Sequence, residues 1–325
     1  MDCAKATAIW VSEDEVKERL DVGAVISILE QAFALVAAGQ AQILPRAHAA
    51  WDGGVLHAVG AALPGAGVAG VKTWTWTPKG ARPVVVVFST ADGSLQGIVD
   101  AVALGQLRTA ATAGLGTRLL AREDASSLAI IGSGRQALSQ VRAVVSVRAI
   151  DEVRVFGRDP GRRAAFARSV HRELDVMVTE HADVASAVRG ADVVTTVTRS
   201  STPVLGGAML EPGMHVNAVG AIVPTSRELD AEAVGRCSVI AVEWRAQAEA
   251  DAGDLRDAVA RGSVRWDEVV ELGTLLAGGA GRQNAEDITL LRTLGVGLSD
   301  VAVAAAVLRS HGGAPSAPVL DATAQ

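Results

Sequence analysis

The stretch Ser127-Leu-Ala-Ile-Ile-Gly-Ser-Gly-Arg-Gln-Ala-Leu-Ser-Gln-Val141 decides the fold. Its apolar run, Leu128–Ile131, predicts a buried parallel strand, and a helical pattern follows the glycines. The linking residues have the G-x-G-x-x-A form of the dinucleotide fingerprint. In this motif Gly132 permits the tight turn, Gly134 lets a pyrophosphate approach the backbone, and Ala137 lets the helix pack on the strand. The unpaired N–H groups at the start of such a helix favour phosphate binding.

The elements around this motif favour a dinucleotide site over an ordinary glycine-rich loop, which a chain with 34 glycines also offers. A second strand is expected at Glu152–Phe156, one βαβ unit later. Ligands of such sheets bind beyond the carboxyl ends of the strands. The threonines expected at those ends are also common strand residues. The residues expected to contact the cofactor are Gly132, Ser133, Gly134, Arg135, Gln136, Arg158, Thr109, Thr196, Thr198, Val219 and Gly220.

Strands and helices alternate after this motif, which predicts an α/β fold with a Rossmann-type doubly wound parallel sheet. Further strands are expected at Met177–Thr179, Asp192–Thr198, Met214–Val219 and Ser238–Val242, with helices at 160–174 and 184–190.

The chain before the motif predicts a different, mainly antiparallel unit. Short runs rich in branched residues fill positions 51–100, and Asp92-Gly93 predicts a hairpin turn. Helices are expected after a capping box at Ser12–Glu15, with a break near Gly23, and at Ala101–Leu120. The segment Asp287–Arg309 is expected to be helical, and residues 312–325 are expected to be frayed.

Composition excludes several classes of protein. The 325 residues are 49% hydrophobic with a net charge of −6, and no dense basic run suggests a nucleic-acid surface. No apolar run is long enough to span a bilayer, and no signal-peptide pattern is present. Cys3 and Cys237 lack metal-ligand spacing, which predicts no metal site and a reduced, cytoplasmic protein.

Three cations are candidates for a shared anion pocket. Arg46, Lys72 and Arg108 are each flanked by apolar or small residues. Any one of them alone is more often a surface charge, but a buried cation needs water or a partner. Arginine also grips carboxylates in a two-pronged geometry.

A set of motifs in this order resembles the ornithine cyclodeaminase and mu-crystallin family over nearly the whole chain. The motifs are Leu44-Pro-Arg46, Gly70-Val-Lys72, Leu107-Arg-Thr-Ala-Ala-Thr112, Ile131-Gly-Ser-Gly134, Asn217-Ala-Val-Gly220 and Arg227-Glu-Leu-Asp230. The resemblance implies a Rossmann domain at 114–302. It also implies an α+β domain at 1–113 with 303–325, which binds substrate and pairs its open sheet with a second subunit. Residues matching Arg46, Lys72 and Arg108 bind a substrate α-carboxylate in that family, and the lysine also takes part in proton transfer.

One departure from the family pattern disfavours the cyclodeaminase reaction. Ile222 stands where the cyclodeaminases place an aspartate, and an aliphatic group moves no protons. His57, which matches a second acid, is either a polar pocket residue or a strand histidine. We therefore expect an NAD(P)H-dependent oxidoreductase acting on a small imino or amino acid. A cyclodeaminase with bound NAD and a non-enzymatic NADP-binding protein are the alternatives.

The end of the second strand bears on the choice of nicotinamide. NAD enzymes place an acid there, and arginines accept a 2′-phosphate. Gly157 occupies the position of the acid and Arg158 follows, which predicts NADP(H). Asp159 either caps the next helix or leaves NAD(H) possible. At the other end of the chain, Asp300 is expected to cap the last helix.

Overall fold

The chain forms two compact units, and the computed structural model describes residues 8–311. The first unit contains the described residues up to Arg108 and those from Val296 onward; the second runs from Thr109 to Gly295. The first boundary falls inside one helix, α3 (Val102–Leu120). Residues 312–325, expected to be frayed, lie outside the described residues.

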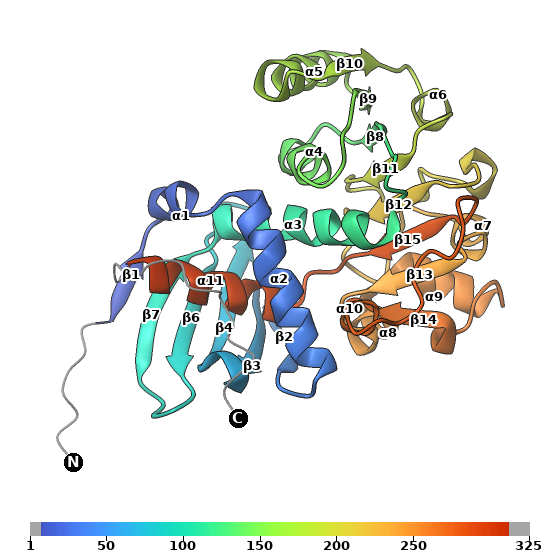
Figure 1. Cartoon of the computed structure of the whole chain (residues 1–325). Helices are drawn as coiled ribbons and strands as arrows, with labels where there is room; N and C mark the ends of the chain where they lie inside the picture. Colours follow the sequence, from blue (N-terminus) through green and yellow to red (C-terminus); the bar gives the residue numbers. More distant parts are fainter. Residues whose placement is uncertain (1–7, 312–325) are drawn as a thin grey trace. The chain divides into compact units, whose positions relative to one another are not determined.

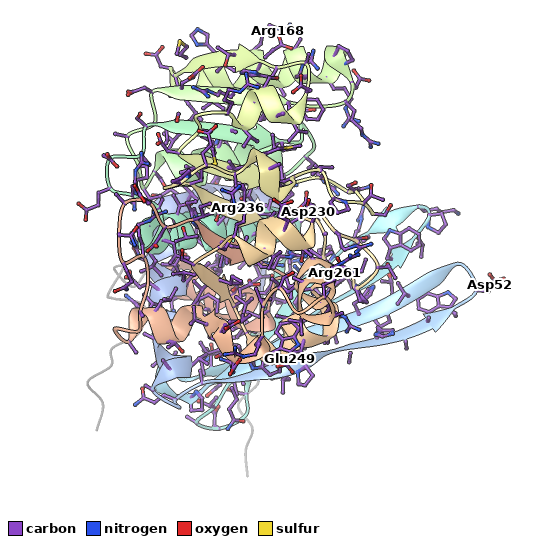
Figure 2. The ribbon with its side chains drawn as sticks, turned by 90° about the vertical axis from the view of Figure 1, so that its right-hand side faces the viewer. Asp52, Arg168, Asp230, Arg236, Glu249 and Arg261 are labelled. Carbon is purple, nitrogen blue, oxygen red and sulfur yellow. The ribbon has the colours of Figure 1, made fainter. Side chains whose placement is uncertain are left out.

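The first unit is built on a seven-stranded sheet of order β1-β7-β6-β4-β3-β2, with β5 paired to β4. All pairs are antiparallel except β1 with β7, so the expected antiparallel unit is confirmed. Asp52 marks the tip of the long β2–β3 hairpin (Figure 2). The strands are β1 (Ile9–Val11), β2 (Gln42–Trp51), β3 (Gly54–Leu63), β4 (Val68–Thr77), β5 (Gly80–Ala81), β6 (Val84–Ser89) and β7 (Leu95–Asp100).

One face of this sheet is covered by α11 (Gly297–His311), and α2 (Val22–Ala37) packs over α11 (Figure 1). The strand registers align a buried row beneath α11: Val11, Val99, Val85, Lys72 and Val59. Small residues let α11 approach closely, since a Cβ on Gly97 would lie 2.5 Å from Leu308 Cδ2. Lys72 is thus a cation in an otherwise apolar row.

The next residue along each strand faces the other way, and these form a second row across the opposite face. Its members are Trp10, Ile98, Val86, Val71, Gly60 and Leu44. Trp10 is 58% exposed and Leu44 is 52% exposed. This row, which we call the open apolar row, leaves large apolar side chains in contact with solvent.

The helix signals near the N-terminus are partly confirmed. Ser12 and Glu15 form the expected capping box at the start of α1 (Glu13–Arg19). The predicted break between two helices is confirmed, but it lies before Val22, and Gly23 is in the first turn of α2. The chain instead breaks at Asp21, whose carboxylate caps α2 by accepting a hydrogen bond from Ala24 N at 2.8 Å.

The second unit is an eight-stranded, fully parallel sheet of order β10-β9-β8-β11-β12-β15-β13-β14. Leu128 and Ile130 of β8 pack with α4 and α5, whereas Ala129 and Ile131 pack with α6, α7 and α9. Both faces are covered, as in a doubly wound fold. The strands are β8 (Ser127–Ile131), β9 (Glu152–Phe156), β10 (Met177–Glu180), β11 (Val193–Thr196), β12 (His215–Ala218), β13 (Val239–Val242), β14 (Val269–Glu271) and β15 (Thr289–Arg292). The helices are α4 (Ala137–Val145), α5 (Pro160–Leu174), α6 (Val184–Val188), α7 (Ala231–Gly235), α8 (Arg245–Asp251), α9 (Gly253–Ala260) and α10 (Leu272–Leu276).

The expectation of one helix over Asp287–Arg309 is wrong. Thr289–Arg292 is β15, which lies between β12 and β13, and the helix begins only at Gly297. All four residues of β15, Thr-Leu-Leu-Arg, are buried, so the strand lacks the apolar–polar alternation that distinguishes a half-buried strand from a buried helix.

A buried chain of polar groups ties α3 to the centre of the parallel sheet. His215 contacts Thr289 Oγ1 through Nδ1 at 2.9 Å and Asn217 Oδ1 through Nε2 at 3.2 Å. Asn217 Nδ2 donates to Thr117 Oγ1 at 2.8 Å, and that hydroxyl donates to Ala113 O. Burial lowers the pKa of His215 to about 3, so the ring is neutral in the folded protein.

Among the described residues, no single helix has the length and apolar character needed to cross a membrane. The pair α1 and α2 meets those requirements only when the two are joined, and they bend by 89° at their junction.

His215 makes the stability of the fold depend on pH. Its pKa of about 3 is below the unfolded value of 6.5, so the unfolded chain binds more protons between those values and stability falls as pH falls. We expect this residue to remove about 2 kcal/mol of unfolding free energy between pH 7 and pH 5. Urea denaturation of wild type and His215→Gln at several pH values measures this loss. The unfolding free energy of the variant should depend less on pH than that of wild type.

Thr117→Val is the matched control, because it cuts the same polar chain without removing a titratable group. It should lower stability by about 1–3 kcal/mol at every pH and keep the wild-type slope. Equal slopes in wild type and His215→Gln would contradict the assignment of a buried neutral histidine.

Candidate functional site

A buried carboxylate holds two of the three candidate cations. Lys72 Nζ donates to Asp300 Oδ1 at 3.0 Å, and Arg108 Nε donates to the same oxygen at 3.0 Å. The Asp300 side chain is fully buried, and those of Lys72 and Arg108 are only 9% and 13% exposed. Strand β4, helix α3 and helix α11 each supply one of these groups.

Arg46 completes the group of cations. Its charge acts on both Lys72 and His57, so the first unit brings together all four residues expected to bind substrate. His57 stacks on Trp74, with ring centroids 4.8 Å apart, and Lys72 Nζ lies 5.5 Å from the centroid of the Trp74 ring. We call Arg46, Lys72, Arg108, Asp300 and His57 the cation cluster.

The charges in the cluster act on one another strongly because most of them are removed from water. Burial lowers the pKa of Lys72; Asp300 opposes this effect, while Arg108 and Arg46 add to it. Burial acts to raise the pKa of Asp300, but the charges of Arg108 and Lys72 outweigh it and the pKa is lowered. Burial, with Arg46 and then His48, also lowers the pKa of His57.

Asp300 is not primarily a helix cap, contrary to the sequence expectation. It lies in the first turn of α11, but its hydrogen bonds go to Lys72 and Arg108. The second oxygen, Oδ2, is buried and has no hydrogen-bond partner within residues 8–311. No short motif could reveal this role, because Lys72 is 228 positions away in the sequence.

The glycine-rich turn of the second unit has the geometry that a dinucleotide requires. Gly132 has φ of +124°, which other residues rarely adopt, and a Cβ there would lie 2.7 Å from Val197 O. A Cβ on Gly134 would meet nothing within 4 Å, so the space beside the backbone is open. Ser133, Arg135 and Gln136 complete the turn before α4 begins at Ala137, which is fully buried.

The end of β9 shows why no acid stands at position 157. A Cβ on Gly157 would lie 2.6 Å from Ser133 Oγ, so the glycine-rich turn occupies that space. Arg158 follows and is exposed. The carboxylate of Asp159 caps α5 by accepting a hydrogen bond from Arg162 N at 2.9 Å. The nearby Arg163 donates to Gly157 O and pairs with Glu180.

A carboxylate that sequence analysis missed joins the ends of β11 and β12. Glu228 is fully buried and accepts hydrogen bonds from Thr196 Oγ1 at 3.0 Å and from the backbone N–H groups of Thr198 and Gly220, both at 2.6 Å. Glu228 therefore holds the ends of these two strands together at the carboxyl edge of the sheet. The residues there are Thr196, Thr198, Val219 and Gly220. The Arg-Glu-Leu-Asp motif was the only sequence signal for Glu228.

The loop after β12 is fixed by another buried charge. Arg292 pairs with Asp254 at 2.6 Å and donates to the carbonyl groups of Ala218 and Ala221. Ile222, next in the chain, is 46% exposed. At the position where the cyclodeaminases have an aspartate, this chain therefore exposes an apolar side chain that cannot transfer a proton. Thr109, the remaining cofactor candidate, lies on α3 at the first position of the second unit.

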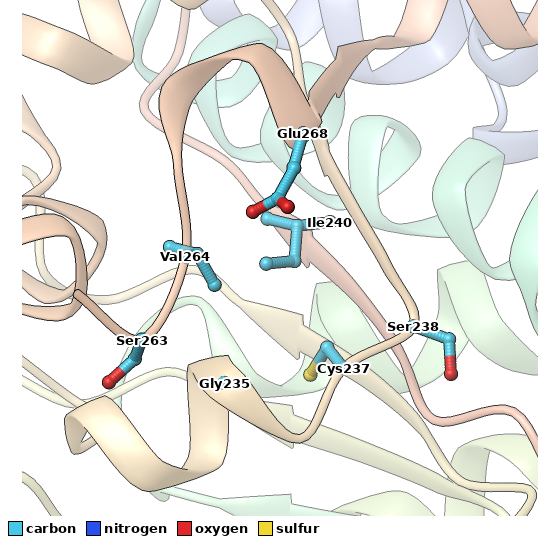
Figure 3. A pocket seen from close by; sticks show the side chains of 7 residues that line it. All are labelled: Gly235, Cys237, Ser238, Ile240, Ser263, Val264 and Glu268. Atoms are coloured by element: carbon cyan, nitrogen blue, oxygen red, sulfur yellow. The ribbon is translucent and has the colours of Figure 1, made fainter.

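A cavity of about 280 Å³ lies elsewhere in the second unit, beside the amino end of β13 (Figure 3). Its lining residues are Gly235, Cys237, Ser238, Ile240, Ser263, Val264 and Glu268. Ligands of doubly wound sheets bind at the opposite, carboxyl ends of the strands, so we do not assign the chemistry to this cavity. Within residues 8–311, no group of three or more histidine, cysteine or acidic side chains is placed to hold a metal ion.

Comparison with known proteins identifies the family. Residues 7–312 match the model of the ornithine cyclodeaminase/mu-crystallin family, and the chain belongs to it. A Δ1-pyrroline-2-carboxylate reductase of Bacillus cereus is 32% identical over 244 residues, which cover 72% of this chain and 75% of that protein.

Two solved structures share the whole fold. The iminosuccinate reductase of Paracoccus denitrificans in complex with NAD⁺ has a TM-score of 0.88 at 29% identity, covering 94% of this chain and 97% of the other. An archaeal alanine dehydrogenase dimer with bound NAD has the same TM-score and identity, covering 94% and 96%. The resemblance seen in the sequence and the expected fold class are both confirmed.

Proposed function

We propose that this protein is an NAD(P)H-dependent reductase of a small imino acid, which it converts to the amino acid. The observation that carries the proposal is the cation cluster: three cations, with one carboxylate among them, inside the first unit. Lys72 and Arg108 share one oxygen of Asp300, and the charge of Arg46 acts on Lys72 as well, so all three cations would attract an α-carboxylate bound in the cluster. The reductases among its relatives act on imines of this kind by their names.

The residues of the cation cluster have two proposed roles, carboxylate binding and proton transfer. Arg46 and Arg108 bind the carboxylate, and the bond from Arg108 Nε to Asp300 fixes the plane of its guanidinium group. Lys72 carries the proton that the substrate nitrogen gains. The reduced nicotinamide supplies the hydride to the imine carbon when it is bound. Ile222 offers no proton, which is why the cyclodeaminase reaction is not proposed.

The proposed cofactor is NADP(H), with NAD(H) as the less favoured form. Arg158 is exposed at the end of β9, where a 2′-phosphate would lie. The nearest acid, Asp159, is engaged at the start of α5 and so is a poor acceptor for a ribose 2′-hydroxyl. The turn at 132–137 would hold the pyrophosphate by its backbone N–H groups.

The proposed assembly is a homodimer formed through the open apolar row. Single exposed apolar residues are common, but a continuous apolar row across six strands of one sheet is typical of a protein–protein interface. A second copy of the same sheet offers the matching surface by symmetry. The archaeal alanine dehydrogenase is a dimer by its description.

We also propose the cytoplasm as the compartment. Cys237 is half-buried and free, and removal of its thiol from water raises its pKa to about 12, which makes it a poor nucleophile. A free thiol of this kind agrees with a reducing compartment.

Substitution of the proton carrier tests the reaction. With Δ1-pyrroline-2-carboxylate and NADPH, we expect wild type to turn over and Lys72→Met to lose about 100-fold or more in kcat/KM. Lys79→Met, at an exposed turn, is the matched control and should match wild type. Equal activity in wild type and Lys72→Met would remove Lys72 from the mechanism, and no turnover by wild type on any cyclic or linear imino acid would refute the function.

Arg158→Ser tests the cofactor preference. We expect the KM for NADPH to rise about tenfold or more, because a charge-assisted contact is lost, and the KM for NADH to stay unchanged. Arg168→Ser removes an exposed arginine of α5 that lies away from the strand end and serves as the control (Figure 2). A clear preference of the wild type for NADH would overturn this assignment.

Sedimentation equilibrium tests the dimer. We expect wild type to be dimeric at micromolar concentration and Leu56→Glu, on the same face as the open apolar row, to weaken association at least about tenfold by burying a charge. Met177→Glu changes an exposed apolar side chain of the other unit and should leave the dimer intact. A monomeric wild type would contradict the proposal.

A further inference from the structure

The proposed reaction leaves one question about Lys72 that the structure answers. A proton donor must be charged before it can act, yet Lys72 is buried and burial lowers its pKa. Two further cations, Arg108 and Arg46, oppose the same charge. Burial and these two charges therefore favour the neutral amine, and a negative charge beside Lys72 opposes them.

We propose that Asp300 is a positioning residue that keeps Lys72 as an ammonium ion and aims its Nζ, so that Lys72 can protonate the substrate nitrogen; this rests on the proposed reductase function. Asp300 lies 3.0 Å from Nζ and is the only carboxylate among the described residues that bonds it. In the proposed reaction this buried acid otherwise only orients the guanidinium group of Arg108.

The local packing agrees with an aimed ammonium group. A Cβ on Gly105 of α3 would lie 3.1 Å from Lys72 Nζ, so a larger residue there would crowd the ammonium. The first turn of α11, which carries Asp300, packs closely on strand β3. A Cβ on Gly297 would lie only 2.2 Å from Gly60 N, so no larger residue fits there. The carboxylate therefore stands on a rigid turn, opposite a lysine on a rigid strand.

The two oxygens of Asp300 have different roles. Oδ1 accepts from both Lys72 and Arg108, so one atom sets the distance between the proton carrier and the guanidinium that binds carboxylate. Oδ2 is buried without a hydrogen-bond partner within residues 8–311. A carboxylate with one unsatisfied oxygen is costly for folding, and such a cost is typical of a group retained for function.

The chemical step balances without a further reactant. A hydride passes from the reduced nicotinamide to the imine carbon, the C=N double bond becomes a single bond, and the nitrogen takes a proton from Lys72 Nζ. The nicotinamide is oxidised, the imine is reduced, and Lys72 is left as a neutral amine. Solvent then returns the proton, and the charge of Asp300 favours that return.

The composition of the chain makes a direct test possible. The sequence contains only four lysines: Lys5, Lys17, Lys72 and Lys79. Protein labelled with ¹³C at lysine Cε therefore gives four signals in a carbon–proton NMR spectrum, and Lys72→Arg identifies the one that belongs to Lys72. The position of that signal reports whether the amine is charged.

In wild type, we expect the Lys72 signal to be that of an ammonium ion at pH 7. In Asp300→Asn it should titrate at lower pH than in wild type, because the attractive charge is gone while Arg108 and Arg46 remain. Lys17, which pairs with Asp14 on the surface, is the internal control and should titrate alike in both proteins.

The pH profile of kcat/KM gives the second reading. In Asp300→Asn the fall in activity at high pH should begin at lower pH, with a loss of about 100-fold near neutrality. A Lys72 signal that titrates identically in wild type and Asp300→Asn would overturn the proposal. So would a neutral Lys72 in wild type at pH 7, an outcome that remains informative if Asp300→Asn does not fold.

These outcomes are separate from those of the proposed function. The NMR titration needs no substrate, so it tests Asp300 even if no imino acid is reduced. Conversely, an active wild type with an uncharged Lys72 would retain the reductase function and exclude the role of Asp300.

Discussion

The contact between the buried carboxylate of Asp300 and the cations of Lys72 and Arg108 is the constraint on which the site depends. It is formed by residues from a strand and two helices, so it also fixes how α11 and the start of α3 pack on the sheet of the first unit. Buried ion groups of this kind add little net stability, because desolvation offsets their attraction. Removing one member, however, leaves an uncompensated charge. The group is therefore better explained by chemistry than by folding.

In the second unit, buried charges likewise hold the backbone around the proposed cofactor site. Its parallel sheet places the glycine-rich turn, the end of β9 and the ends of β11 and β12 at one edge. Buried charges behind that edge hold the ligand-facing backbone: Glu228 joins Thr198 to Gly220, and Arg292 holds the loop before Ile222. Both charges bond to backbone groups of these loops, and Arg292 is also paired with Asp254, so the loops are fixed by buried charges that already have partners.

Much of the fold could be predicted from the sequence because its signals are local. The strand at 152–156 and the helix at 160–174 were predicted with their observed bounds, and the capping box at Ser12 is present. The failures have physical causes. β15 is short and buried at every position, so its sequence shows no alternation, and α2 begins at the Asp21 cap rather than at Gly23.

The candidate site was predictable only in part. Arg46, Lys72 and Arg108 were identified by their unusual apolar neighbours and by the family resemblance, and the structure brings them together. Asp300 and Glu228 were missed or misread, because their partners are distant in the sequence and short motifs do not report long-range contacts. The cations proposed to bind substrate stood out locally, whereas the buried acids that bond to neighbouring protein groups did not.

Calorimetric titration with a planar substrate analogue measures whether the cation cluster binds a carboxylate. Pyrrole-2-carboxylate and pyrrole-2-carboxamide have the same shape and differ in charge, and both can be titrated into the protein with NADP⁺ present. We predict that the carboxylate binds at least about 100-fold more tightly than the amide, since each charge-assisted hydrogen bond contributes about 1.5–3 kcal/mol. Equal affinities for the two compounds would contradict the account.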